Sequence, residues 1–188
     1  MDGLVNTVYH RSVMMAFEPV DVGIGWSSAV ANQVSLPLVI DMTRPGSDPV
    51  RGLGQGAQEA IGGVSLWPLD HAINVPTRLG LENPNPIPDR DVLSLGTPLS
   101  VTIDRLKTIS TLNFVLTNTT TGIAVPTRTL TNQNDPNFII PPSFVAAIPL
   151  AVLSANTNYT VTFSGSAATL AGSVESVVRT WSFTTAER

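Results

Sequence analysis

The chain has 188 residues, a formal net charge of −4 and no cysteine, which excludes disulfides, thiol nucleophiles and thiolate metal sites. Only 13% of its residues are charged, against about 25% in an average soluble protein. Lys107 is the only lysine, so no basic stripe is available for nucleic acid. No run approaches the roughly 20 apolar residues that a membrane helix needs. The first residues lack the features of a signal peptide, so for an exported protein we expect the signal outside this chain.

The first part of the chain, residues 1–45, predicts a short helix followed by a β-hairpin. Residues 8–17 (VYHRSVMMAF) contain few helix breakers, and Pro19 ends the predicted helix. Residues 21–28 (DVGIGWSS) and 35–43 (SLPLVIDMT) are typical of two paired strands. About forty residues are at the lower limit for independent folding, so we expect this segment to pack on another part of the protein.

Residues 46–63 are rich in Gly and Pro, which predicts a linker. From Val64 onward, short apolar runs alternate with turn signals over residues 64–69, 99–103, 109–116, 123–130, 138–140, 145–150, 159–163 and 177–184. This spacing predicts an antiparallel β-sandwich over residues 64–188. The proline-rich residues 79–95 are too long for a tight hairpin, and we expect them to form an ordered surface loop.

The final strand pair is the clearest signal, because its large apolar side chains occupy every second position. Tyr159, Val161 and Phe163 alternate with polar residues, and Trp181 with Phe183 repeats the pattern. Period-two spacing is typical of a strand with one buried face. The predicted interior comprises Trp181, Phe183, Tyr159, Phe163, Phe114, Leu112 and Val101.

Several motifs in order resemble those of bacterial Ig-like domains (SbsA-type). They are Trp67-Pro68, residues 71–76 (HAINVP), 98–103 (PLSVTI), 148–150 (IPL), 158–163 (NYTVTF) and 180–185 (TWSFTT). The match covers about two thirds of the chain. The resemblance implies a mainly β, Ig-like antiparallel β-sandwich preceded by the short helix and hairpin. Such modules are usually noncatalytic spacers or adhesive units of exported or cell-surface bacterial proteins.

The first segment resembles the closing part of bacterial CAP (SCP-like) domains. The residues concerned are Tyr9-His10-Arg11 on a helix, followed by residues 21–25 (DVGIG). In that family the histidine that corresponds to His10 lines a cavity with a second histidine and acidic residues supplied by earlier sequence, which this chain does not contain. The resemblance implies a partial CAP segment, residues 1–45, joined to the Ig-like domain, residues 64–188.

His10, Arg11 and Trp26 are the candidate ligand-binding residues. Imidazole titrates near neutrality and ligates transition metals, but a metal site needs three or four ligands, and the first segment has one histidine. The structural interpretation, a helix residue that packs or hydrogen-bonds, is therefore favoured for His10. Exposed tryptophans stack on sugar rings, and the sequence does not predict the environment of Trp26. Trp181 is expected in the core of the sandwich, and Trp67 is expected to pack at the end of the domain.

Two further groups have competing interpretations. Glu82, Asp89 and Asp91 are close in sequence and form either a calcium site or solvated loop charges, and the missing Asp/Asn alternation favours the second. Asp70 and His71 are neighbours whose side chains are expected to diverge, so the pair caps a turn and does not form a catalytic dyad. No G-x-S-x-G motif occurs.

The sequence thus predicts a noncatalytic structural or adhesive module that needs no cofactor and no metal. Its expected partner is a neighbouring domain or a component of the cell envelope, and its expected location is extracellular or in the envelope. Two alternatives remain open. One is a ligand-binding or hydrolase-like role of the CAP portion through His10, and the other is glycan binding through exposed aromatic side chains.

Overall fold

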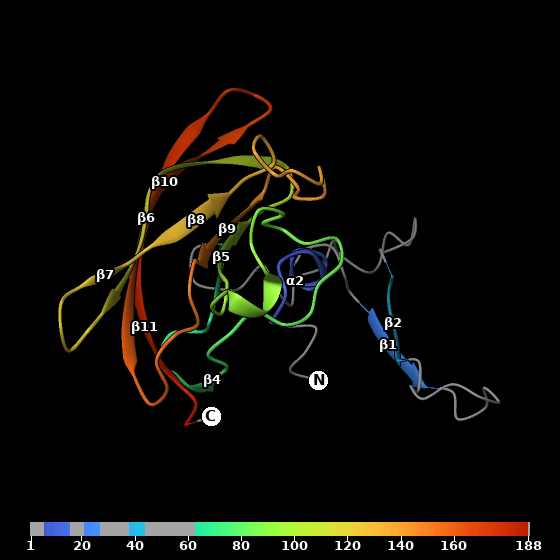
Figure 1. Ribbon diagram of the computed structural model, residues 1–188. Coiled ribbons are helices and arrows are strands. Elements are labelled where there is room, and N and C mark those ends of the chain that lie inside the picture. Colours follow the sequence, from blue (N-terminus) through green and yellow to red (C-terminus); the bar gives the residue numbers. More distant parts are fainter. Residues whose placement is uncertain (1–5, 16–20, 27–37, 44–62, 188) are drawn as a thin grey trace.

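The computed structural model describes residues 6–15, 21–26, 38–43 and 63–187, and gives only the backbone for 21–26 and 38–43. Within these ranges the chain is mainly β, with two sheets packed face to face and one short α-helix (Figure 1). The predicted fold class, a mainly β sandwich with a helix and a hairpin before it, is confirmed. The predicted linker lies outside the described residues except for Gly63.

The elements fall into three groups. The first comprises helix α2 (Tyr9–Met14) and the antiparallel strands β1 (Asp21–Trp26) and β2 (Leu38–Thr43). The second is a four-stranded sheet in the order β3 (Val64–Trp67), β5 (Leu99–Ile103), β9 (Phe144–Pro149) and β8 (Thr127–Leu130). The third is a five-stranded sheet in the order β4 (Ala72–Val75), β11 (Val174–Thr185), β10 (Asn158–Thr169), β6 (Lys107–Asn118) and β7 (Ala124–Val125). Only the β4–β11 pair is parallel among the described strands.

One predicted strand is absent from the structure, and one observed strand was not predicted. Residues 138–140 form no strand, because the carboxylate of Asp135 accepts hydrogen bonds from the N–H groups of Ile139 and Ile140, which a ladder would need. Strand β4 was not predicted, because Asn74 adopts a positive φ of 57° and interrupts the alternation of a short run. Turn chemistry, which the apolar pattern does not encode, explains both differences.

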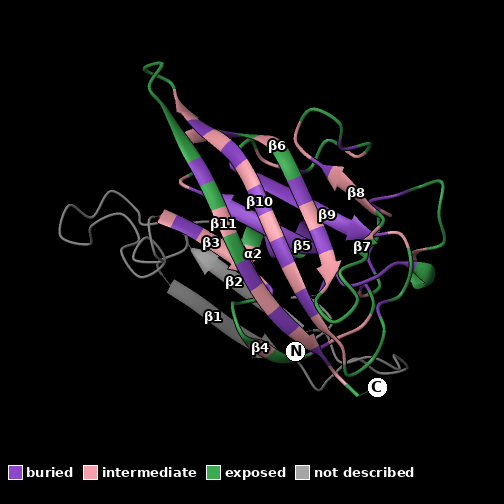
Figure 2. Cartoon of the chain, turned by 90° about the vertical axis from the view of Figure 1, so that its left-hand side faces the viewer, coloured by how far each residue is buried: buried purple, intermediate pink, exposed green. Residues whose placement is uncertain are grey.

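The core between the two sheets confirms most of the predicted interior. Trp181, Phe183, Tyr159, Phe163, Phe114 and Val101 are all buried there. Figure 2 shows the corresponding alternation of buried and partly exposed residues along β10. The aromatic rings contact one another, with Phe114 edge-on to Phe163 at 5.2 Å between centroids and 6.1 Å from Trp181.

The prediction for Leu112 is wrong, since its side chain is 84% exposed. Strand β6 pairs with β10 with a register shift: Asn113 lies opposite Ser164, but Thr111 lies opposite Gly165. Leu112 is therefore the extra residue of a β-bulge, and the inward-facing phase changes from Ile109 to Phe114 across it. Leu112 is two residues before the buried Phe114, so regular alternation would bury both side chains. The one extra residue of the bulge directs Leu112 towards solvent instead.

The bulge requires glycine on the partner strand. A Cβ added at Gly165 would lie 2.1 Å from the carbonyl oxygen of Ser110. We expect Gly165→Ala to destabilise the protein by about 2–3 kcal/mol, because backbone must move to relieve the overlap. Urea unfolding measures this change, with Ala168→Gly on the same strand as the control. A loss below about 0.5 kcal/mol would show that the close approach is absent.

The two central strands of the four-stranded sheet are buried on both faces, since every residue of β5 and of β9 is buried. Its outer face packs in a second apolar cluster, comprising Val8, Tyr9, Leu79, Ile87, Leu95, Leu130, Ile140, Phe144, Ala146 and Ile148. The proline-rich loop, residues 79–95, begins and ends next to the isolated β-bridge between Arg78 and Gly96. At the base of the loop the N–H of Leu79 donates to the carbonyl oxygen of Leu95. This proline-rich loop and helix α2 therefore form a third layer over the sandwich (Figure 1).

Candidate functional site

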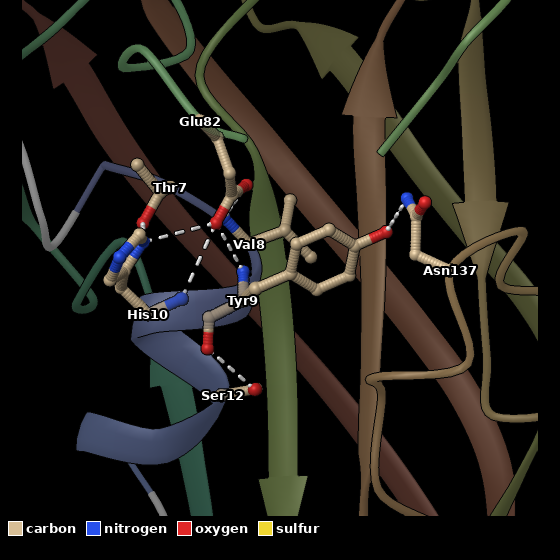
Figure 3. Close-up of polar contacts among 7 residues, drawn as sticks. All are labelled: Thr7, Val8, Tyr9, His10, Ser12, Glu82 and Asn137. Atoms are coloured by element: carbon tan, nitrogen blue, oxygen red, sulfur yellow. Dashed lines mark hydrogen bonds and ion pairs between the residues drawn. The ribbon is translucent and has the colours of Figure 1, made fainter. Parts of the chain in front are cut away.

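The N-terminus of helix α2 is bound by Glu82, a residue of the proline-rich loop (Figure 3). Its carboxylate accepts hydrogen bonds from the N–H groups of Val8 and Tyr9, both at 2.7 Å, and from that of His10 at 3.3 Å. Val8, the N-cap, makes no side-chain cap of its own. Glu82 therefore satisfies helix N–H groups that have no partner within the helix, and its negative charge lies at the positive end of the helix dipole.

His10, the first predicted site residue, lies on the rim of this contact. Its side chain is 49% exposed, and Nδ1 lies 3.4 Å from Glu82 Oε1 and 3.3 Å from Thr7 Oγ1. The same Glu82 oxygen already accepts from two backbone N–H groups. The imidazole of His10 therefore lies beside a carboxylate whose oxygens already accept hydrogen bonds from backbone N–H groups of helix α2.

Arg11, the second predicted site residue, is fully buried. Its Nη1 donates to the carbonyl oxygen of Pro98 at 2.7 Å, and its guanidinium lies over the ring of Trp67, 5.1 Å from the centroid. Burial lowers the pKa of Arg11, and the negative charge of Glu82 opposes this effect. Arg11 therefore fastens the helix to β3 and to the segment that enters β5.

Tyr9 supplies the third contact, directed away from His10 (Figure 3). Its hydroxyl donates to Asp135 Oδ1 at 2.6 Å and accepts from Asn137 Nδ2 at 2.7 Å. Burial raises the pKa of the Tyr9 phenol, so the proton stays in place for the bond to Asp135. The segment 6–15 is thus linked to the loop between β8 and β9.

Asp135 gives this contact a dependence on pH. Burial opposes its ionisation, but the hydroxyl of Tyr9 and the N–H groups of Ile140, Ile139 and Asn137 outweigh that effect and hold its pKa below the usual value. The stabilisation is complete above the unfolded-state pKa of about 3.9 and is lost as the pH falls through the lower native pKa. We expect Asp135→Asn to reduce stability at pH 7 and to flatten the acid limb of a stability profile. An unchanged acid limb would exclude Asp135 as its source.

The other predicted residues are placed elsewhere. Trp26 lies on β1, where the side chain is outside the described residues. Trp67 is partly buried beneath Arg11. The three loop carboxylates point to separate partners: Glu82 to α2, Asp89 to Arg128, and Asp91 to the first turn of the 3-10 helix η2 (Val92–Ser94). These acidic residues do not converge on a common point, and no cluster of metal-ligating side chains occurs in the described ranges.

Asp70 and His71 contradict the expectation that their side chains diverge. His71 has a φ of 59°, which brings its Nε2 to 3.6 Å from Asp70 Oδ2 and its Nδ1 to 3.3 Å from the hydroxyl of Ser182. Asp70 also accepts from the N–H of Ser182, which ties the start of β4 to β11. The imidazole is largely exposed to water, and these contacts hold the residues before β4 against β11.

Sequence reasoning did not connect Glu82 and Asp135 with the segment 6–15. Glu82 contacts residues 72–74 positions earlier, and Asp135 contacts Tyr9 across 126 positions. The sequence does not single out Glu82 for this role, because Asp89 and Asp91 are carboxylates of the same loop. The assembled site binds a peptide segment through its backbone N–H groups, one guanidinium and one phenol.

Comparisons with known proteins do not assign the chain to a family. No family model matches the chain, and no curated protein matches it. In the part of the chain that the structure describes, no helix has the length and apolar character to cross a membrane.

Proposed function

We propose that the chain is a noncatalytic, Ig-like structural module of an exported or cell-surface bacterial protein, and that it holds the CAP-type segment before it in a fixed position. Its place of action is extracellular or in the cell envelope. The proposed partner is the neighbouring domain of the same protein or an envelope component. The module needs no cofactor for this role.

The strand order supports an Ig-like identity. Sheets β3-β5-β9-β8 and β4-β11-β10-β6-β7 correspond to the Ig orders A-B-E-D and G-F-C, with β4 and β7 as additional edge strands. The hydroxyl of Tyr159, at the start of the strand in the F position, accepts from the N–H of Ser154, five residues upstream. That contact has the form of the tyrosine corner found in Ig-type sandwiches.

The docked segment 6–15 is the observation that carries the structural role. Glu82, Arg11 and Tyr9 make three separate polar attachments, and Val8 is buried completely between them. A spacer that transmits position needs its entering segment fixed by several contacts. Here the fixing residues come from the proline-rich loop, the loop after β8 and the residues before β5.

Electron spin resonance tests whether the segment holds its position in solution. Because the chain has no cysteine, Val13→Cys and Ile123→Cys, both exposed, give a single labelled pair across helix and sandwich. We expect one narrow distance distribution, which Glu82→Ala broadens and Glu175→Ala leaves unchanged. A broad distribution in the otherwise wild-type chain would contradict a fixed position.

A ligand-binding role for His10 is the competing proposal. His10 and Glu82 are the titratable side chains that meet there, and the Glu82 carboxylate is already occupied by three N–H groups. We therefore expect zinc titration calorimetry to detect no tight site. Micromolar binding that disappears in His10→Ala would favour the CAP-derived role instead.

A further inference from the structure

One end of the sandwich presents apolar side chains to solvent from three separate turns. We call this set the apolar end and define it by Leu106, Phe138, Ile139, Leu170 and Val174, all exposed. Leu106 lies between β5 and β6, Phe138 and Ile139 between β8 and β9, and Leu170 between β10 and β11. Strand pairing puts these connections at the same end, as Figure 1 shows at the top of the view.

Phe138 is the most informative member, because its exposure is imposed by the fold. It is 88% exposed and has a φ of 55°, a conformation that a bulky residue rarely adopts. Buried Asp135 holds the turn, with its carboxylate accepting from the N–H groups of Asn137, Ile139 and Ile140. The structure therefore keeps a strained backbone that directs an aromatic ring into water.

The other two turns are also fixed by local hydrogen bonds. Asp104 accepts from the N–H of Leu106 at 2.9 Å. The hydroxyls of Thr169 and Ser173 lie 2.7 Å apart and close the turn that carries Leu170, which is 94% exposed. Each apolar tip is thus preorganised, so little ordering is needed when it enters an apolar phase.

We infer that the apolar end inserts into the surface of a lipid bilayer. Separate projecting tips suit a fluid acyl layer, which conforms to each of them, whereas a folded protein would have to supply a pocket for each. This end carries no excess of basic side chains, since Asp104, Glu175 and the buried Asp135 accompany Arg105 and Lys107, and Lys107 pairs with Glu175. Insertion therefore depends on apolar contact and not on anionic lipid.

This inference goes beyond the proposed spacer role and does not depend on it. The chain's last described residues lie at the opposite end, where Ala186 donates to the carbonyl oxygen of Val75. The last described residues therefore do not cover the apolar end (Figure 1). A protein with this arrangement holds its N-terminal segment on one face and touches lipid with one end.

Vesicle flotation of the full chain tests the inference with phosphatidylcholine vesicles, alone and with added phosphatidylglycerol. We expect the wild type to float with both, at low and high salt alike. The double variant Phe138→Ser and Leu170→Ser should lower the partition coefficient by about tenfold or more, since two exposed side chains no longer enter the acyl region. Ile73→Ser, which removes a 73% exposed side chain at the other end, should change nothing.

A second measurement does not depend on the double variant. A polarity-sensitive dye on Leu170→Cys should shift to the blue with vesicles, and the same dye on Ile73→Cys should not. Four results would overturn the inference: no flotation of the wild type, equal flotation of the double variant, binding only to anionic vesicles at low salt, or lipid-free self-association that the double variant abolishes. The last result would identify a second copy of the chain as the partner of the apolar end.

Discussion

Replacing Trp181 by alanine is expected to destabilise the protein by about 3–5 kcal/mol, the range for emptying a large aromatic site in a core. Trp181 is 2% exposed, lies opposite Val161 in the β10–β11 pair and contacts the ring of Phe114. Trp181 belongs to the buried cluster between the two sheets, where close packing prevents the cavity from closing completely. Urea or thermal unfolding measures the change.

Trp181→Phe is the matched control. The indole N–H of Trp181 has no hydrogen-bond partner among the described residues, so phenylalanine removes no hydrogen bond and leaves a smaller cavity. We expect a loss of about 1–2 kcal/mol for this variant. A loss below about 1 kcal/mol for the alanine variant would contradict a core position.

The sequence predicted the inner core well because that information is local. Alternation at Tyr159, Val161 and Phe163 specifies the buried face of one strand without reference to any other element. Leu112 shows where this reasoning fails. Its parity is that of Phe114, but a bulge depends on the partner strand, and Gly165 accommodates it from more than fifty positions away.

The second apolar cluster and the docked helix could not be predicted from the local sequence pattern, for a different reason. A run such as residues 144–149 (FVAAIP) is buried on both faces, but its sequence does not say what covers the outer face. The cover comes from the proline-rich loop and from residues 6–15, which lie far away in the chain. His10 and Arg11 were singled out together, but the fold separates them into a half-exposed rim residue and a buried anchor.

Replacing Glu82 by alanine is expected to cost about 3–5 kcal/mol and to release helix α2 from the sandwich. The Glu82 side chain is fully buried, and its removal leaves the N–H groups of Val8, Tyr9 and His10 without their acceptor. It also removes the negative charge that favours the protonated guanidinium of Arg11 in its buried position. Both losses act on the same element, so the helix should lose its protection before the sandwich unfolds.

Two variants separate this effect from a general loss of charge. Glu175→Ala removes an exposed partner of Lys107 and should cost less than about 1 kcal/mol. Glu82→Gln keeps the shape but directs an amide N–H₂ group at N–H donors, so its cost should lie between the other two. Amide hydrogen exchange at Val8 to His10 then gives the direct readout. Exchange that accelerates in Glu82→Ala while the amides of β10 stay protected indicates local release, whereas unchanged exchange would show that the carboxylate does not hold the helix.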